Sequence, residues 1–96
     1  MALLDSLTWH VMDATADDWE SLEQILPHLR RFHGVVDPSE AAEVIVRLVR
    51  DGLMEEMRHG SVDAQAVVKE PIEYWFRMTP LGRSLWDSEG AKYRDE

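Results

Sequence analysis

The residues DPSEAAEVIVRLVRDGL, from Asp37 to Leu53, carry the signals for the start and the end of one helix. Asp37 can accept hydrogen bonds from the free amides of a first turn, and Pro38 suits the first helical position. Gly52 supplies the left-handed conformation that commonly ends a helix. Apolar residues recur between these signals at three- and four-residue spacing, namely Ala41, Ala42, Ile45, Leu48 and Val49. The sequence therefore predicts a helix from Pro38 to Asp51 with one buried face.

Two more helices are expected before this one. Residues 1–14 carry apolar side chains at helical spacing. Residues 17–33 repeat that pattern, and their helix starts at a capping box headed by either Asp17 or Ser21. If Ser21 is the cap, a very short strand can precede the helix. Pro27 lies inside the apolar pattern, so we expect a kink or a break there.

After Gly52, the pattern changes to short strands and ends in a helix. Leu53 to His59 has enough β character for one strand, and Ile72 to Met78 alternates as a second strand does. Ala64 to Glu70, between them, either extends the hairpin or forms a loop. Thr79 and Pro80 can open a final helix. The side chains expected to face inward here are Ile72, Tyr74, Phe76, Met78, Leu81, Leu85 and Trp86.

Two segments resemble parts of a known architecture, the winged helix-turn-helix. Residues 47–56, RLVRDGLMEE, resemble the join between recognition helix and first wing strand in bacterial winged-helix regulators. Residues 74–83, YWFRMTPLGR, resemble the second wing strand and its Thr-Pro-x-Gly-Arg exit in MarR-, PadR- and ArsR-like proteins. The resemblance implies an α+β fold and one winged-helix domain over residues 1–96. That domain would have three helices, a two-stranded β-hairpin wing and a C-terminal helix.

By this resemblance, Pro38 to Asp51 would be the recognition helix and Arg58 to Pro71 the wing. Such a helix reads bases with exposed residues near its start. The residues expected to contact DNA or a partner are Ser39, Glu40, Glu43, Arg47, Arg50, Arg58 and Lys69, with Arg30 and Arg31 beside them if they share that face. Glutamate can accept a hydrogen bond from cytosine, but it opposes contact with phosphates.

The charge of the chain bears directly on its partner. The 96 residues include 19 Asp and Glu against 10 Lys and Arg, for a formal net charge of −9. A duplex repels such a surface unless the basic residues cluster. One hypothesis is therefore a small DNA-binding transcriptional regulator acting as a homodimer. The alternative is an acidic winged-helix module for protein–protein contact. A basic face on the helix and wing would favour the first, whereas an acidic face with exposed Trp75 or apolar residues would favour the second.

Several other classes of function find no support in the sequence. It contains no nucleophile signature or Gly-rich phosphate loop, so we expect neither an enzyme nor a cofactor. His28 and His33 lie roughly 140° apart around a helix, which disfavours a shared metal. No apolar run is long enough for a membrane span, no signal peptide is expected, and the chain has no cysteine. These features are consistent with a cytoplasmic protein.

The aromatic residues suggest both a core and an interface. We expect Trp9 and Trp86 to fill the core between helices. For a homodimer, the first helix is the expected contact, because Leu4, Trp9 or Met12 could remain exposed after its stripe is packed inward.

Overall fold

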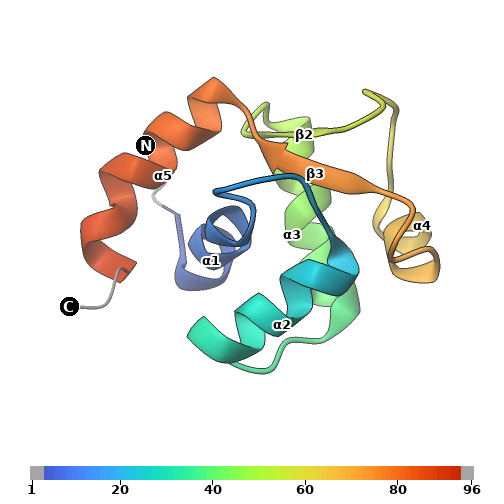
Figure 1. Ribbon diagram of the computed structural model, residues 1–96, viewed down its shortest axis with the longest axis horizontal. Coiled ribbons are helices and arrows are strands. Elements are labelled where there is room, and N and C mark those ends of the chain that lie inside the picture. The colour runs from blue at the N-terminus through green and yellow to red at the C-terminus, as the bar shows by residue number, and fades with distance from the viewer. Residues whose placement is uncertain (1–3, 94–96) are drawn as a thin grey trace.

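The computed structural model describes residues 4–93, which form an α+β architecture with five helices and three strands (Figure 1). The elements are α1 Ser6–Ala14, β1 Glu20–Ser21, α2 Leu22–Phe32, α3 Pro38–Arg50, β2 Met54–Glu56, α4 Ala64–Lys69, β3 Trp75–Met78 and α5 Pro80–Tyr93. The expected α+β class is confirmed, but the two-stranded hairpin is part of a larger sheet and the connection between its strands contains a helix. We call residues 57–74 the β2–β3 connection.

The sheet is antiparallel, with β3 between β1 and β2. Glu56 pairs with Phe76 on one side of β3, and Glu20 pairs with Phe76 on the other. The alternation expected in the second strand is present, because Phe76 and Met78 are buried while Arg77 is exposed. Ile72 does not follow it and is 58% exposed, because the chain turns there and the strand begins only at Trp75.

The three helices before the hairpin largely follow the sequence signals. The Asp37 carboxylate accepts from the Ser39 amide at 2.8 Å, and Gly52 ends α3 with a φ of 78°. The helix α2 starts at the Ser21 cap, whose amide donates to Gln24 at 3.1 Å, so the alternative with a short preceding strand is the correct one. It continues through Pro27 without a break.

The first helix is shorter than expected. It begins at Ser6, where the Asp5 carboxylate accepts from the Thr8 amide at 2.8 Å, and residues 1–3 of the expected helix lie outside the described residues. Its apolar face packs between α2 and α5. The fully or nearly fully buried side chains form one core, and they include Trp9, Val11, Met12, Leu22, Ile25, Leu29, Ala41, Ala42, Ile45, Leu48, Met54, Val67 and Phe76.

The last helix is joined tightly to the sheet. The Thr79 hydroxyl accepts from the Gly82 amide at 3.0 Å, as expected of a cap, and donates to the Gly52 carbonyl at 2.6 Å. A Cβ at Gly82 would overlap the carbonyl group of Leu53, so only glycine allows α5 to approach so closely. Leu81, expected inside, is 62% exposed, because the buried side of this turn is the one that carries Gly82.

The expected core role of two tryptophans holds for Trp9, which is 2% exposed, while Trp86 is half-buried. Their rings stack with centroids 6.1 Å apart, and the Trp9 indole N–H donates to the Trp86 carbonyl at 2.9 Å. The Trp86 indole in turn donates to Asp13 at 3.1 Å. Together these contacts attach α5 to α1.

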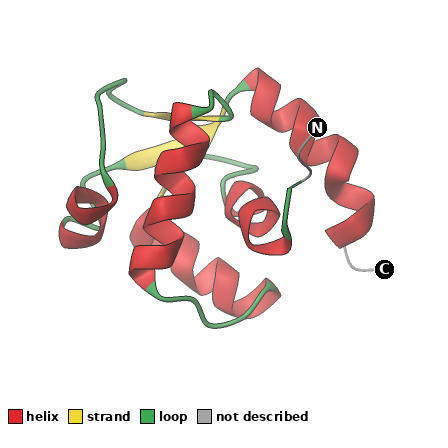
Figure 2. Ribbon diagram, turned by 180° about the vertical axis from the view of Figure 1, so that it is seen from behind, coloured by secondary structure: helices red, strands yellow, loops and turns green. Residues whose placement is uncertain are grey.

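The helix α4 was not expected, since residues 64–70 were predicted to be strand or loop. The Asp63 carboxylate accepts from the Ala66 amide at 2.8 Å and caps it. Val67 is completely buried against the core, and α4 packs on α3. Seen from behind, α3 lies nearest the viewer with α4 along one side of it (Figure 2). Helix α4 therefore forms a side wall next to the helix expected to make functional contacts.

Candidate interaction surface

The exposed side of α3 carries its charges in two groups. Ser39, Glu40 and Glu43, on the first half of the helix, are all exposed. Arg47 and Arg50 are exposed on the second half. The face is therefore neither uniformly basic nor uniformly acidic.

The residues expected to contact a partner do not all share one surface. Ser39, Glu43 and Lys69 line a depression between α3 and α4, and Arg50 lines a second depression further along α3. Arg47 lines neither of them. Glu40 lines neither of these depressions.

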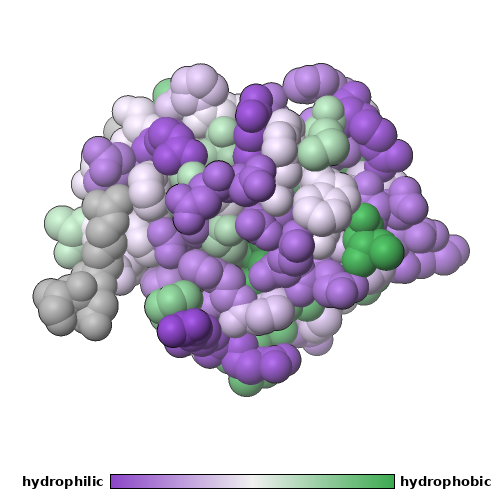
Figure 3. Space-filling model, in the orientation of Figure 1, coloured by the Kyte–Doolittle hydropathy of each residue, from purple (hydrophilic) through white to green (hydrophobic). Residues whose placement is uncertain are grey.

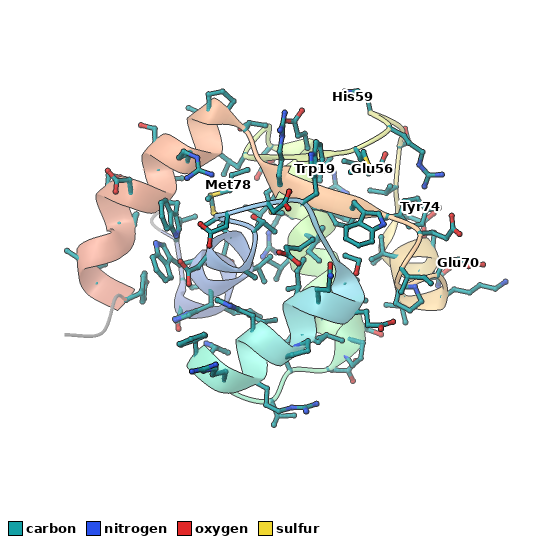
Figure 4. The ribbon with its side chains drawn as sticks, viewed as in Figure 1. Trp19, Glu56, His59, Glu70, Tyr74 and Met78 are labelled. Carbon is teal, nitrogen blue, oxygen red and sulfur yellow. The ribbon has the colours of Figure 1, made fainter. Side chains whose placement is uncertain are left out.

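Arg58, expected to contact a partner from the wing, is instead held by its own chain. Its guanidinium lies 3.4 Å from the Glu56 carboxylate, donates to the Glu73 carbonyl at 3.3 Å and covers the Tyr74 ring at 5.0 Å. Glu56 is only 2% exposed and also accepts from the Gly60 amide at 3.1 Å. Figure 4 shows Glu56 and His59 at the start of the β2–β3 connection and Tyr74 at its end. Arg58 thus stabilises the connection.

The two other arginines expected near this surface lie at the end of α2. Arg30 and Arg31 are exposed, and Arg31 covers the Phe32 ring at 5.2 Å. Neither lines the depressions beside α3.

Those two depressions follow one another along the same side of α3, and we call them together the α3 groove. The first measures about 330 Å³ and the second about 310 Å³. The first is lined by Ser39, Glu43, Ala64, Gln65, Val68 and Lys69, and the second by Val46, Val49, Arg50, His59, Gly60, Ser61 and Val62. The β2–β3 connection supplies one wall, and α3 supplies the other.

The apolar lining of the groove was missed in the sequence. Val46 lies in a charged arc of α3, yet it faces the groove beside Val49 and Val62. Val68 faces the first depression from α4. The one available signal was Asp63, a residue type that caps helices, three positions before Ala66. The opposite face of the molecule is mostly hydrophilic, with small and separate hydrophobic patches (Figure 3).

Two carboxyl groups away from the groove have shifted pKa values. Hydrogen bonds from Thr8 hold the pKa of Asp5 below its usual value, and Arg47 and His33 lower it further. Burial raises the pKa of Glu20, and the nearby carboxylate of Asp18 raises it further.

The histidines are involved in local contacts between helices. His28 lies 3.1 Å from Asp13, and His33 lies 3.0 Å from the Ser6 hydroxyl. Within residues 4–93, no group of three or more His, Asp or Glu side chains is arranged to hold a metal ion.

The surface expected for a homodimer is not present on α1. Leu4, Trp9 and Met12 are all buried, because α1 packs between the other helices and α5 covers Trp9. Trp75, the other candidate contact, is half-buried, and its indole N–H donates to the Ile72 carbonyl at 3.0 Å. No helix among the described residues has the length and apolar character needed to cross a membrane.

Comparison with known proteins finds no match to a protein family, a curated protein or a solved structure.

Proposed function

We propose that this chain is a winged-helix module that binds another protein through α3 and the β2–β3 connection. The observation that carries the proposal is the valine-lined α3 groove. Val46, Val49, Val62 and Val68 are half-buried against the core, and their remaining exposed surface lies in a concave site. Such a surface favours contact with apolar groups of a partner, which a phosphate backbone lacks.

The winged-helix part of the proposal is supported by the order of the elements. Three helices precede the β2–β3 pair, and α5 follows it. The Thr-Pro-x-Gly-Arg segment, residues 79–83, lies where β3 enters α5, as the resemblance implies. The added α4 is a departure from a simple hairpin wing.

The charges near the start of α3 disfavour DNA as the partner. A recognition helix reads bases from its first turns, and here those turns present Glu40 and Glu43. Among the basic residues expected to meet phosphates, Arg58 is instead bound to the Glu56 carboxylate and the Glu73 carbonyl. The long-range repulsion expected from the net charge of −9 acts in the same direction.

A DNA-binding regulator remains the second candidate, and the observation that favours it is the pair Arg47 and Arg50. The two residues are three positions apart and both are exposed on α3. If they contact phosphates, each lost contact should reduce the salt dependence of binding by about one unit of slope. Glu43→Gln should then tighten non-specific binding by removing a repulsion.

The two candidates can be separated by two measurements on the same protein. The first is binding of random-sequence duplex at low salt, where attraction between charges is least screened. The protein-contact proposal predicts no binding that depends on Arg47 and Arg50. Binding by the wild type that disappears in Arg47→Ala/Arg50→Ala would refute the proposal and support the regulator.

The second measurement places a photo-crosslinking amino acid in the groove, at Val46 or Val68, in the cells from which the protein comes. A protein adduct of the same mass is expected from both positions. The matched control is position 84 on α5, which is also exposed but lies outside the groove. Equal adducts from position 84 would mean that the groove is not the contact site.

A further inference from the structure

The α3 groove has a shape suited to one kind of occupant. From Ser39 to Arg50 the helix rises about 16 Å, which is about three turns. The two depressions lie one after the other over this length, with volumes of about 330 and 310 Å³. Their linings on α3 are centred about seven residues apart, which corresponds to about 10 Å along the helix. Two apolar side chains two turns apart on a partner helix have this spacing, as in other complexes where an amphipathic helix lies in a groove.

The charges lining the groove differ from those of the molecule as a whole. Among them, Arg50 and Lys69 are permanent cations, and Glu43 is the one carboxylate. Within the part of the chain that the structure describes, neither Arg50 nor Lys69 has a side-chain hydrogen bond or an ion pair. His59 lies at the Arg50 end, with its side chain 75% exposed and its Nδ1 4.0 Å from the Glu55 carboxylate. The formal charges of the lining residues therefore sum to +1, from Arg50 and Lys69 against Glu43, on a protein of net charge −9.

We infer that the α3 groove binds an acidic amphipathic helix of a partner protein. Two apolar side chains of that helix occupy the depressions, and carboxylates beside them pair with Arg50 and Lys69. The inference rests on the proposed protein-contact function and specifies its partner. Salt screens those acidic residues of the chain that lie more than about 8 Å from the groove at physiological ionic strength.

Selection from a library of random peptides tests the chemistry without a known partner. The probe is a phage-displayed library of peptides of about 14 residues, long enough for a helix of about 21 Å. The selection is carried out on the immobilised full chain. Enriched peptides are expected to share two apolar residues seven positions apart and to carry net negative charge.

Variants of groove residues then locate the binding site of the best synthetic peptide. Arg50→Gln is expected to weaken binding about tenfold or less, by removal of one charge pair. At Gln65, which is exposed and lines the groove, Gln65→Glu should weaken binding and Gln65→Lys should strengthen it. Gln65 is exposed, so neither substitution should disturb folding. Opposite changes in affinity would therefore report the charge of the peptide. The matched control Ser84→Glu on α5 should leave the affinity unchanged.

Three results would overturn the inference. The first is enrichment of basic peptides whose binding depends on Gln65 and Arg50; it would keep the protein-contact function and reverse the charge of the partner. The second is enrichment of peptides whose affinity is the same for the wild type and for all the groove variants. The third is no enrichment at all. If the third accompanies duplex binding lost in Arg47→Ala/Arg50→Ala, the proposed function fails as well.

Discussion

Replacing Gly82 with alanine tests how α5 is attached to the rest of the fold. A Cβ at this position would overlap the Leu53 carbonyl oxygen, and it would lie 2.8 Å from the carbonyl carbon and 3.2 Å from the Cα of Leu53. These are backbone atoms, and they cannot rotate away as a side chain can. The same Leu53 carbonyl accepts from the Thr79 amide at 3.1 Å, and the Thr79 hydroxyl donates to the Gly52 carbonyl at 2.6 Å. Relief of the overlap must therefore disturb both hydrogen bonds.

The size of the effect follows from three contributions. Overpacking of a buried position costs typically about 1–3 kcal/mol. Two weakened hydrogen bonds add about 1 kcal/mol each. Against these, alanine favours a helix over glycine by about 1 kcal/mol. The free energy of unfolding should fall by about 2–4 kcal/mol, and the melting temperature by about 10–25 °C for a domain of this size.

Thermal and urea unfolding followed by far-ultraviolet circular dichroism would measure this loss. The control is Ser84→Ala, an exposed position on the same helix, where alanine should stabilise the protein by a few tenths of a kcal/mol. If the free energy of unfolding of Gly82→Ala instead lies within about 0.5 kcal/mol of the wild-type value, the close contact between α5 and Leu53 does not attach α5 to the rest of the fold.

Four further substitutions, of which Ile72→Ala is a control, test a cap, a buried charge and the core, each by urea unfolding. Asp5→Ala should cost about 1 kcal/mol at pH 7; since folding lowers the pKa of Asp5, this cost is complete above the ordinary value of 3.8 and should shrink as the pH falls below it. Glu20→Gln should stabilise the protein at pH 7, because burial and Asp18 raise the pKa of Glu20 and so disfavour its ionised form; the gain should vanish below the ordinary value of 4.5. Phe76→Ala should cost about 3–5 kcal/mol, whereas Ile72→Ala, at an exposed turn, should be nearly neutral. A constant Asp5→Ala cost down to pH 3, or similar losses at Phe76 and Ile72, would contradict the reasoning.

The sequence predicted those elements whose signals are local. Asp37 and Pro38 at the start of α3, Gly52 at its end and Thr79 before α5 all act within one helical turn. Such signals depend on backbone hydrogen bonds between near neighbours, and tertiary packing need not be known. For this reason the bounds of α3 are correct to one residue.

Packing between distant segments decided the features that the sequence did not reveal. Val67 and Val68 have β-branched side chains, which favour a strand, yet α4 is a helix because Val67 is buried against the core and Asp63 caps its first turn. Leu81 has the spacing of a buried residue, but the approach permitted by Gly82 turns it outward. Periodicity identifies an apolar stripe on a helix, but it does not show how much of that stripe a neighbouring element covers.

The contact surface itself could be predicted only in part. Ser39, Glu43, Arg50 and Lys69 were expected at a surface and do line the α3 groove, whereas Arg58 is bound within its own chain. The apolar lining could not be expected, because it exists only when residues 59–69 fold back against α3. The contacts of Arg58 with Glu56, Glu73 and Tyr74 depend on the same folding.

Val46 connects the sequence to the proposed function. It lies on α3 among exposed polar positions, where a charged side chain would keep the helix equally soluble. Instead it is half-buried at the edge of the core and continues the apolar lining of the groove past Val49 to Val62. A helix that read DNA through this arc would gain little from a valine between two depressions, since phosphates and base edges are met mainly by polar and basic groups. An apolar side chain of a partner helix, in contrast, would lose its water against this wall and gain about 25 cal/mol for each Å² that it buries. The valine, the two depressions and the free cations at their edges are therefore best explained together by one acidic amphipathic occupant.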